Sequence, residues 1–80
     1  MRLELAPKVD KYIRALYEPT RSRIKKALVR LTKEPPEGDI KSLTGKDGYR
    51  LRVGKYRLLF DIIDNTIIVY DMGLRDKIYK

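Results

Sequence analysis

The chain has 80 residues, of which 19 are Lys or Arg and 11 are Asp or Glu, so its formal net charge is +8. A chain of this length has room for one domain, residues 1–80, and its excess of positive charge favours acidic partners: nucleic acid first, an acidic protein second, anionic lipid third. Cysteine and histidine are both absent, which excludes a disulfide framework and leaves a zinc site only carboxylate ligands.

The amino-terminal residues predict a short strand. Residues 2–6, RLELA, alternate apolar and charged side chains, and Pro7 ends that pattern while suiting the first turn of a helix. Glu4 interrupts the apolar run, so the segment is no signal peptide. No stretch approaches the ~20 apolar residues of a membrane span. We therefore expect a soluble cytoplasmic protein that needs no metal or other cofactor and binds no membrane.

Two helices are expected next, over residues 7–16 and 20–33. Apolar residues recur at helical spacing in both, and Glu18 with Pro19 separates them. The hydroxyl of Thr20 is expected to cap the second helix, and the pair Pro35-Pro36 follows its end. The two apolar faces comprise Val9, Tyr12, Ile13 and Leu16, then Ile24, Ala27, Leu28 and Leu31.

The other face of the second helix is basic. It carries Arg21, Arg23, Lys25, Lys26 and Arg30. This pattern has two interpretations, a solvated helix surface or a contact surface for nucleic acid or a partner protein. The sequence alone leaves both open.

After the helices, the pattern changes to that of a sheet. Residues 35–48 contain prolines and glycines and read as an ordered connector, with Ile40 and Leu43 as anchors. Three strands are expected over residues 49–53, 56–63 and 66–72. Gly54-Lys55 suits a type II′ turn and Asp64-Asn65 a type I′ turn. The predicted fold is α+β, with two helices packed on one face of an antiparallel sheet in the order βααβββ.

The first hairpin gathers arginines on one face. A turn at Gly54-Lys55 places Arg52 opposite Arg57 and Arg50 opposite Leu59, so the three arginines share a face. The helix-packing face then comprises Leu51, Val53, Leu58, Phe60, Ile62, Ile67 and Val69.

Like charges that face each other destabilise a sheet by roughly 0.2 to 1 kcal/mol per pair. One interpretation leaves the arginines in water, with stems over Leu59 or Tyr70 and Asp61 nearby to dilute the charge. The other, which we favour, is a binding surface for RNA phosphates, with guanidinium groups that lack a countercharge within the molecule.

The last residues, MGLRDKIYK, add further basic and aromatic groups. Continuing the second hairpin without interruption places Arg75 opposite Gly54, at the same end of the sheet as Arg52, although Gly73 could introduce a bulge. Tyr79 is either a terminal aromatic without a role or a ring that stacks on a base, with its hydroxyl available to the scissile bond.

These residues together resemble the RelE/ParE toxin superfamily, in particular its RelE-like branch of ribosome-dependent mRNA endonucleases. The motifs are LTG at 43–45, GYRLRVGKYRL from residue 48 and GLRDKIY from residue 73, and the resemblance covers the whole chain. Two departures are the arginines at 50 and 52, where some members have lysine, and Leu74, where many have histidine or lysine.

The resemblance implies an activity and the residues that carry it. The implied catalytic residues are Arg50, Arg52, Arg57, Arg75 and Tyr79, and Lys46, Lys55 and Lys77 are expected to bind RNA. The reaction is attack of an RNA 2′-hydroxyl on the neighbouring phosphate in the ribosomal A site, without a metal. Implied partners are a cognate antitoxin, the ribosome and mRNA, with DNA contacted only through the toxin–antitoxin complex.

The proton-transfer groups stay open, because arginine cannot be deprotonated and histidine is absent. The candidates are Tyr79, a lysine among Lys46, Lys55 and Lys77, a carboxylate with a shifted pKa, or the ribosome itself. Two other functions also stay open: a ParE-like inhibitor of DNA gyrase, and a basic binding module without catalysis.

Overall fold

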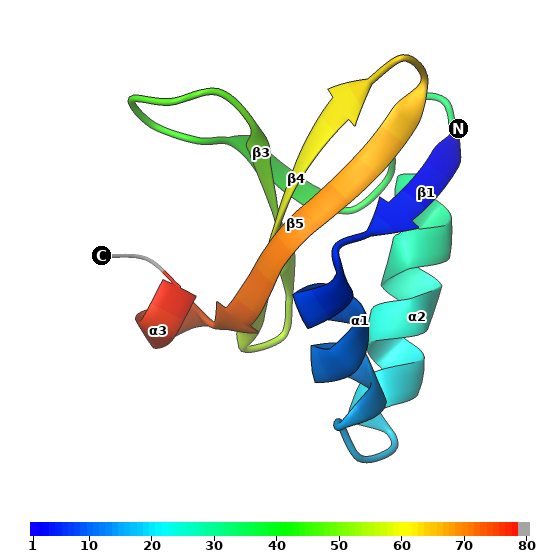
Figure 1. The fold of residues 1–80 in the computed structure, drawn as a ribbon, viewed down its shortest axis with the longest axis vertical. Coiled ribbons are helices and arrows are strands. Elements are labelled where there is room, and N and C mark those ends of the chain that lie inside the picture. Colours follow the sequence, from blue (N-terminus) through cyan, green and yellow to red (C-terminus); the bar gives the residue numbers. More distant parts are fainter. Residues whose placement is uncertain (79–80) are drawn as a thin grey trace.

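The computed structural model describes residues 1–78, and these form an α+β fold (Figure 1). The five strands are β1 (Arg2–Leu5), β2 (Asp39–Ser42), β3 (Tyr49–Val53), β4 (Tyr56–Ile63) and β5 (Thr66–Leu74). The helices are α1 (Pro7–Arg14), α2 (Thr20–Leu31) and α3 (Arg75–Ile78). Each predicted helix and strand is present, with ends within two residues of the prediction.

The strands form one sheet in the order β1-β5-β4-β3-β2. β1 runs parallel to β5, and every other neighbouring pair is antiparallel. Figure 1 shows α1 and α2 together on one side of the sheet, with α3 beyond the end of β5. The predicted fold class, with both long helices on one face, is therefore confirmed. No helix within residues 1–78 is long and apolar enough to cross a membrane.

One strand was not predicted. β2 lies inside the connector 35–48 and pairs with β3, with Asp39 opposite Arg52 and Lys41 opposite Arg50. It is only four residues long and follows Gly38, so the turn-forming composition around it hides its pattern. The expected anchors are in place: Leu43 is buried, and Ile40 packs against the core.

The two hairpin turns have the predicted geometry. Gly54 has a φ of 59°, as the first position of a type II′ turn requires. Asp64 and Asn65 have φ values of 49° and 59°, as in a type I′ turn. These turns set the register of the sheet.

The predicted cap of α2 is wrong. Thr20 is the first helical residue, Pro19 occupies the cap position, and no side chain at that position caps the helix. Glu18 takes over this role, because its Oε1 accepts hydrogen bonds from the Ser22 backbone N–H at 3.0 Å and from Ser22 Oγ at 2.6 Å. These bonds hold the pKa of Glu18 below its ordinary value.

The core lies between the sheet and the two long helices. Its fully buried side chains come from both layers: Val9, Ile24, Leu31, Leu51, Leu58, Phe60, Ile67 and Val69. The prediction fails for Ile62, which is 39% exposed. Ile62 lies two residues from the Asp64-Asn65 turn, at the end of the sheet where β4 leaves the core.

A β-bulge between Leu59 and Phe60 shifts the second hairpin. Phe60 faces Val69 as predicted, but Leu59 faces Asp71 and Arg57 faces Gly73. Arg75 consequently lies beside Lys55, whose carbonyl accepts its N–H at 2.9 Å, and the prediction that it faces Gly54 is wrong. Because the extra residue reverses the alternation, Asp71 and Gly73 share a face with Arg57.

Candidate functional site

The three hairpin arginines share one face of the sheet, as predicted. Arg52 faces Arg57 and Arg50 faces Leu59. Their neighbours Leu51 and Leu58 are buried in the core beneath the helices, so the arginines project from the opposite side. We call this side of β3 and β4, which carries Arg50, Arg52 and Arg57, the arginine face.

Two of these arginines already share a countercharge. Asp39 on β2 accepts from Arg50 Nη1 with its carbonyl at 2.9 Å and with Oδ1 at 3.2 Å. Its Oδ2 accepts from Arg52 Nε at 3.1 Å. The Arg50 side chain is only 12% exposed and that of Arg52 is 41% exposed. Arg50 is therefore fixed in position, and Arg52 is more accessible.

The prediction that the arginine face lacks an internal countercharge is thus wrong for Arg50 and Arg52. The hydrogen bond from Arg50 is the main reason why the pKa of Asp39 lies below its ordinary value, so the carboxylate is charged at neutral pH. One carboxylate against the guanidinium groups of Arg50 and Arg52 leaves a formal charge of +1 on these three residues. Asp39 therefore holds two cations of the face in place without neutralising both of them.

Arg57 occupies the centre of the sheet. It is half-buried, and its Nε is buried. Gly73 faces it on β5 and is itself buried. A Cβ at Gly73 would lie 3.7 Å from Ile78 Cβ, so α3 packs closely over this glycine. Arg57 is therefore enclosed more than a surface arginine normally is.

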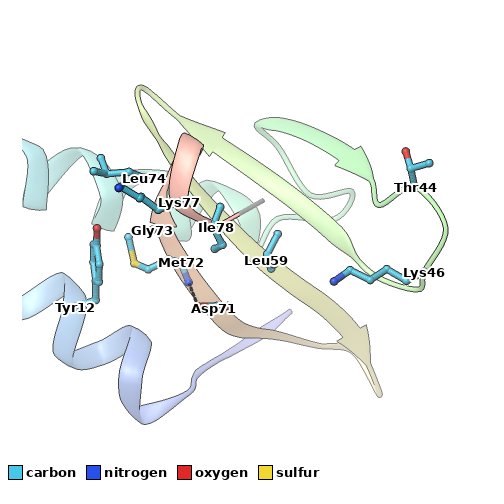
Figure 2. A pocket seen from close by; sticks show the side chains of 10 residues that line it. All are labelled: Tyr12, Thr44, Lys46, Leu59, Asp71, Met72, Gly73, Leu74, Lys77 and Ile78. Atoms are coloured by element: carbon cyan, nitrogen blue, oxygen red, sulfur yellow. Dashed lines mark hydrogen bonds between the residues drawn. The ribbon is translucent and has the colours of Figure 1, made fainter. Parts of the chain in front are cut away.

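An open groove of about 810 Å³ lies between α1, β5 and α3 (Figure 2), and it is lined in part by Gly73, which faces Arg57. Its lining residues are Tyr12, Thr44, Lys46, Leu59, Asp71, Met72, Gly73, Leu74, Lys77 and Ile78. Figure 2 shows Lys46 reaching in from the 43–48 loop, with Lys77 on α3 at the other end. Asp71 contributes a carboxylate, whose Oδ1 lies 3.4 Å from Lys8 Nζ.

Tyr12 closes the groove on the helix side. Its ring packs edge-on against Tyr56, with centroids 6.2 Å apart. Burial, and then the neighbouring Tyr56, raises the pKa of Tyr12. The hydroxyl therefore stays protonated at neutral pH and can act as a hydrogen-bond donor. The helical spacing of Tyr12 predicts a residue of the apolar helix face and carries no signal that its ring also lines this groove.

The remaining predicted cations meet at the Gly54-Lys55 turn. A cleft of about 510 Å³ there is lined by Gly54, Lys55, Leu74, Arg75 and Lys77. Lys55 Nζ lies 5.9 Å from the centroid of the Tyr56 ring, and Arg75 is exposed. Lys77 lines both this cleft and the groove. Tyr79, predicted as a catalytic residue, lies outside the described residues.

The arrangement suits a phosphate-rich ligand. Guanidinium groups bind phosphate with two parallel hydrogen bonds, and the fixed orientation of Arg50 removes much of the entropy cost of such binding. Lysines at both ends of the groove can hold neighbouring phosphates or transfer protons. Three further residues of the site, Asp39, Asp71 and Tyr12, were not predicted from the sequence.

Comparison with known proteins gives a consistent match. The model of the family "ParE toxin of type II toxin-antitoxin system, parDE" matches residues 3–79. No curated protein matches the chain.

Among solved structures, the archaeal RelE-RelB complex from Pyrococcus horikoshii OT3 is similar, with 26% identity, a TM-score of 0.80 and coverage of 95% of this chain and 96% of that one. The RelB-RelE antitoxin-toxin complex from Methanococcus jannaschii has 28% identity, a TM-score of 0.77 and coverage of 95% and 94%. The isolated E. coli RelE toxin has 27% identity, a TM-score of 0.75 and coverage of 91% and 82%.

Proposed function

The chain belongs to the ParE toxin family of type II toxin–antitoxin systems, and we propose that it is a toxin that cuts mRNA on the ribosome and thereby inhibits translation. The observation that carries this proposal is the arginine face, with Arg57 between Arg52 on β3 and Gly73 on β5. The 26–28% identity to RelE structures over nearly the whole chain supports the same function. The protein would act in the cytoplasm, where its target is translated.

The proposed reaction is an intramolecular transfer within the RNA. The 2′-oxygen attacks the neighbouring phosphorus, the bond to the 5′-oxygen breaks, and the products are a 2′,3′-cyclic phosphate and a 5′-hydroxyl. One proton leaves the 2′-hydroxyl and one reaches the departing 5′-oxygen. No cofactor takes part in this balance.

The arginines would stabilise the charge that develops on the phosphate. Arg57 has a buried Nε and Arg50 is held by Asp39, so both would be restricted in orientation before RNA binds. A preorganised donor of this kind contributes about 3 to 4 kcal/mol to transition-state stabilisation in an enclosed site. Arg52 and Arg75 are more exposed and would bind flanking phosphates.

Proton transfer would fall to the groove. Lys46 and Lys77 line it from the 43–48 loop and from α3, and Tyr79 is a third candidate. Lys55 would contact RNA beside the hairpin turn. Because none of these groups is an imidazole, the proposed enzyme differs from histidine-dependent ribonucleases in its expected pH profile.

A cognate antitoxin would silence this activity. Two of the similar structures are complexes of RelE with RelB, and an acidic antitoxin segment on the arginine face would replace the RNA phosphates there. We expect DNA to be contacted only through the toxin–antitoxin complex. The mRNA and the ribosome are the partners of the free toxin.

Expression without an antitoxin tests the proposal. Wild-type protein should produce cuts in coding mRNA that depend on ribosomes, and Arg57→Ala and Arg75→Ala should abolish them with the fold retained by circular dichroism. Because Arg57 is half-buried, Arg57→Lys serves as a second variant that keeps the charge and the stem. Intact mRNA with wild-type protein would overturn the proposal.

The family model favours one alternative, inhibition of DNA gyrase in the manner of ParE. This function needs no RNA cleavage. DNA damage signalling together with intact mRNA in the same expression experiment would identify it. A basic binding module without catalysis would give neither signal.

A further inference from the structure

A second basic surface lies on α2, on the other side of the sheet from the arginine face. Four of the six exposed residues of this helix are basic, namely Arg23, Lys25, Lys26 and Arg30, and Lys33 lies two residues after the helix end. The helix sequence TRSRIKKALVRL contains no acidic residue. Val29, 65% exposed, is the large apolar side chain on this surface.

Few of these cations are neutralised. Arg30 Nε lies 3.6 Å from Glu37, and Arg21 Nη2 lies 3.3 Å from Glu18. Within residues 1–78, no ion pair involves the four remaining cations of this surface, which are Arg23, Lys25, Lys26 and Lys33. On the arginine face, by contrast, Asp39 already pairs with two cations.

The cations are arranged in a row. Arg23, Lys26, Arg30 and Lys33 follow spacings of three, four and three residues, which keeps them on one side of a helix. The last turn extends to Lys33, because its N–H bonds to the Arg30 carbonyl at 3.3 Å. At 1.5 Å per residue the row is about 15 Å long. A row of this kind can follow a phosphate backbone without reading bases.

Other partners fit the surface less well. A helix that lies on a membrane inserts its apolar face, but Ile24, Leu28 and Leu31 are at most 4% exposed because they form the core. Protein interfaces centre on buried apolar or aromatic anchors, and Val29 offers little such area. The charge of the surface is complementary to a polyanion with regularly spaced charges.

We propose that the α2 surface, Arg23, Lys26, Arg30 and Lys33, binds the phosphate backbone of structured RNA. The described chain measures 31 × 27 × 22 Å along its principal axes, and the two basic surfaces lie on opposite sides of it. An RNA that contacts both must therefore reach around the protein, and a folded RNA cleft has such a shape before the protein binds. The identification of this RNA as ribosomal rests on the proposed function, whereas the binding itself does not.

Charge-neutral variants test the proposal. Arg23→Gln/Lys26→Gln removes two cations from the row, and Lys11→Gln/Arg14→Gln on α1 is the matched control, with the same charge change and the same spacing of three residues. The probes are a short labelled RNA duplex, titrated at several salt concentrations, and purified ribosomes. Cleavage of ribosome-bound mRNA is measured in parallel.

The α2 variant should make the slope of log affinity against log salt less negative by about 2, because each lost phosphate contact removes about 0.9 from its magnitude. It should also raise the ribosome concentration needed for half-maximal cleavage and leave the maximal rate unchanged. The α1 control should change neither. Equal losses in both variants would show a general charge effect and overturn the proposal.

Unchanged RNA affinity with loss of antitoxin binding would assign the surface to an acidic protein and would also overturn the proposal. If the protein does not cut mRNA at all, the experiment still tests the α2 surface separately. In that case wild-type protein leaves mRNA intact, while the salt slope on the RNA duplex still reports whether α2 contacts phosphate.

Discussion

Removing the charge of Asp39 should strengthen RNA binding. Its carboxylate pairs with Arg50 and Arg52 at 3.2 Å and 3.1 Å, so it competes with an RNA phosphate for the same guanidinium groups. Asp39→Asn keeps an oxygen acceptor for Arg50, and the carbonyl bond at 2.9 Å does not depend on the side chain. The substitution therefore changes the charge of the cluster more than the orientation of its arginines.

The size of the effect follows from counterion release. The group formed by Arg50, Arg52 and residue 39 gains one unit of positive charge, from +1 to +2, because the substitution removes the carboxylate that pairs with both arginines. One further phosphate contact on single-stranded RNA steepens the salt slope by about 0.7. With equal affinity at 1 M salt as the reference, binding should be about eightfold tighter at 0.05 M salt and about fourfold tighter at 0.15 M salt.

Fluorescence anisotropy with a labelled single-stranded RNA measures this change across a salt series. Asp64→Asn is the matched control, because Asp64 is exposed in the far hairpin turn, where asparagine tolerates its φ of 49°. The control should show a much smaller gain. Equal or weaker binding by Asp39→Asn, with the fold retained, would refute the assignment of the arginine face to phosphate binding.

Three further predictions concern stability and pH. Phe60→Ala should lower the free energy of unfolding by about 3 to 5 kcal/mol in urea titrations, because Phe60 is fully buried and stacks on Tyr49 with ring centroids 5.4 Å apart. The control Ile63→Ala, at an exposed position, should lower it far less. Equal losses in the two variants would contradict the described core. Glu18→Gln should lower the melting temperature at neutral pH, and the difference from wild type should disappear in acid. Because the fold lowers the pKa of Glu18, its carboxylate stabilises the protein fully above the ordinary pKa, and this stabilisation is lost as the pH falls through the pKa of the folded state. A difference in melting temperature that persists in acid would argue against the cap. The cleavage rate should show no inflection near about pH 6.5, since the chain has no histidine, and a clear one would place a catalytic group on another molecule.

The hairpin could be predicted closely because local rules determine it. Gly54-Lys55 and Asp64-Asn65 are turn pairs with specific backbone requirements, and the turns fix which residues face each other. The shared face of Arg50, Arg52 and Arg57 follows from those turns alone. The packing of Leu58 and Phe60 follows from the same alternation.

The features that the sequence did not reveal depend on longer-range geometry. β2 has four residues within a glycine- and proline-rich connector, so Asp39 gave no sign that it would pair with Arg50 and Arg52. The bulge at Leu59 and Phe60 has no glycine to mark it, and it moved Arg75 beside Lys55. The groove joins Tyr12 to Lys77, residues brought together only by the complete fold.

End mapping on ribosomes programmed with one defined mRNA tests most directly whether the arginine face cuts RNA. Wild-type protein should cut within the A-site codon and leave 2′,3′-cyclic phosphate and 5′-hydroxyl ends. Folded Arg57→Lys should bind the ribosome but cut far more slowly, because lysine lacks the planar fork that contacts phosphate twice. Intact mRNA with wild-type protein, or equal cutting by both proteins, would contradict the claim.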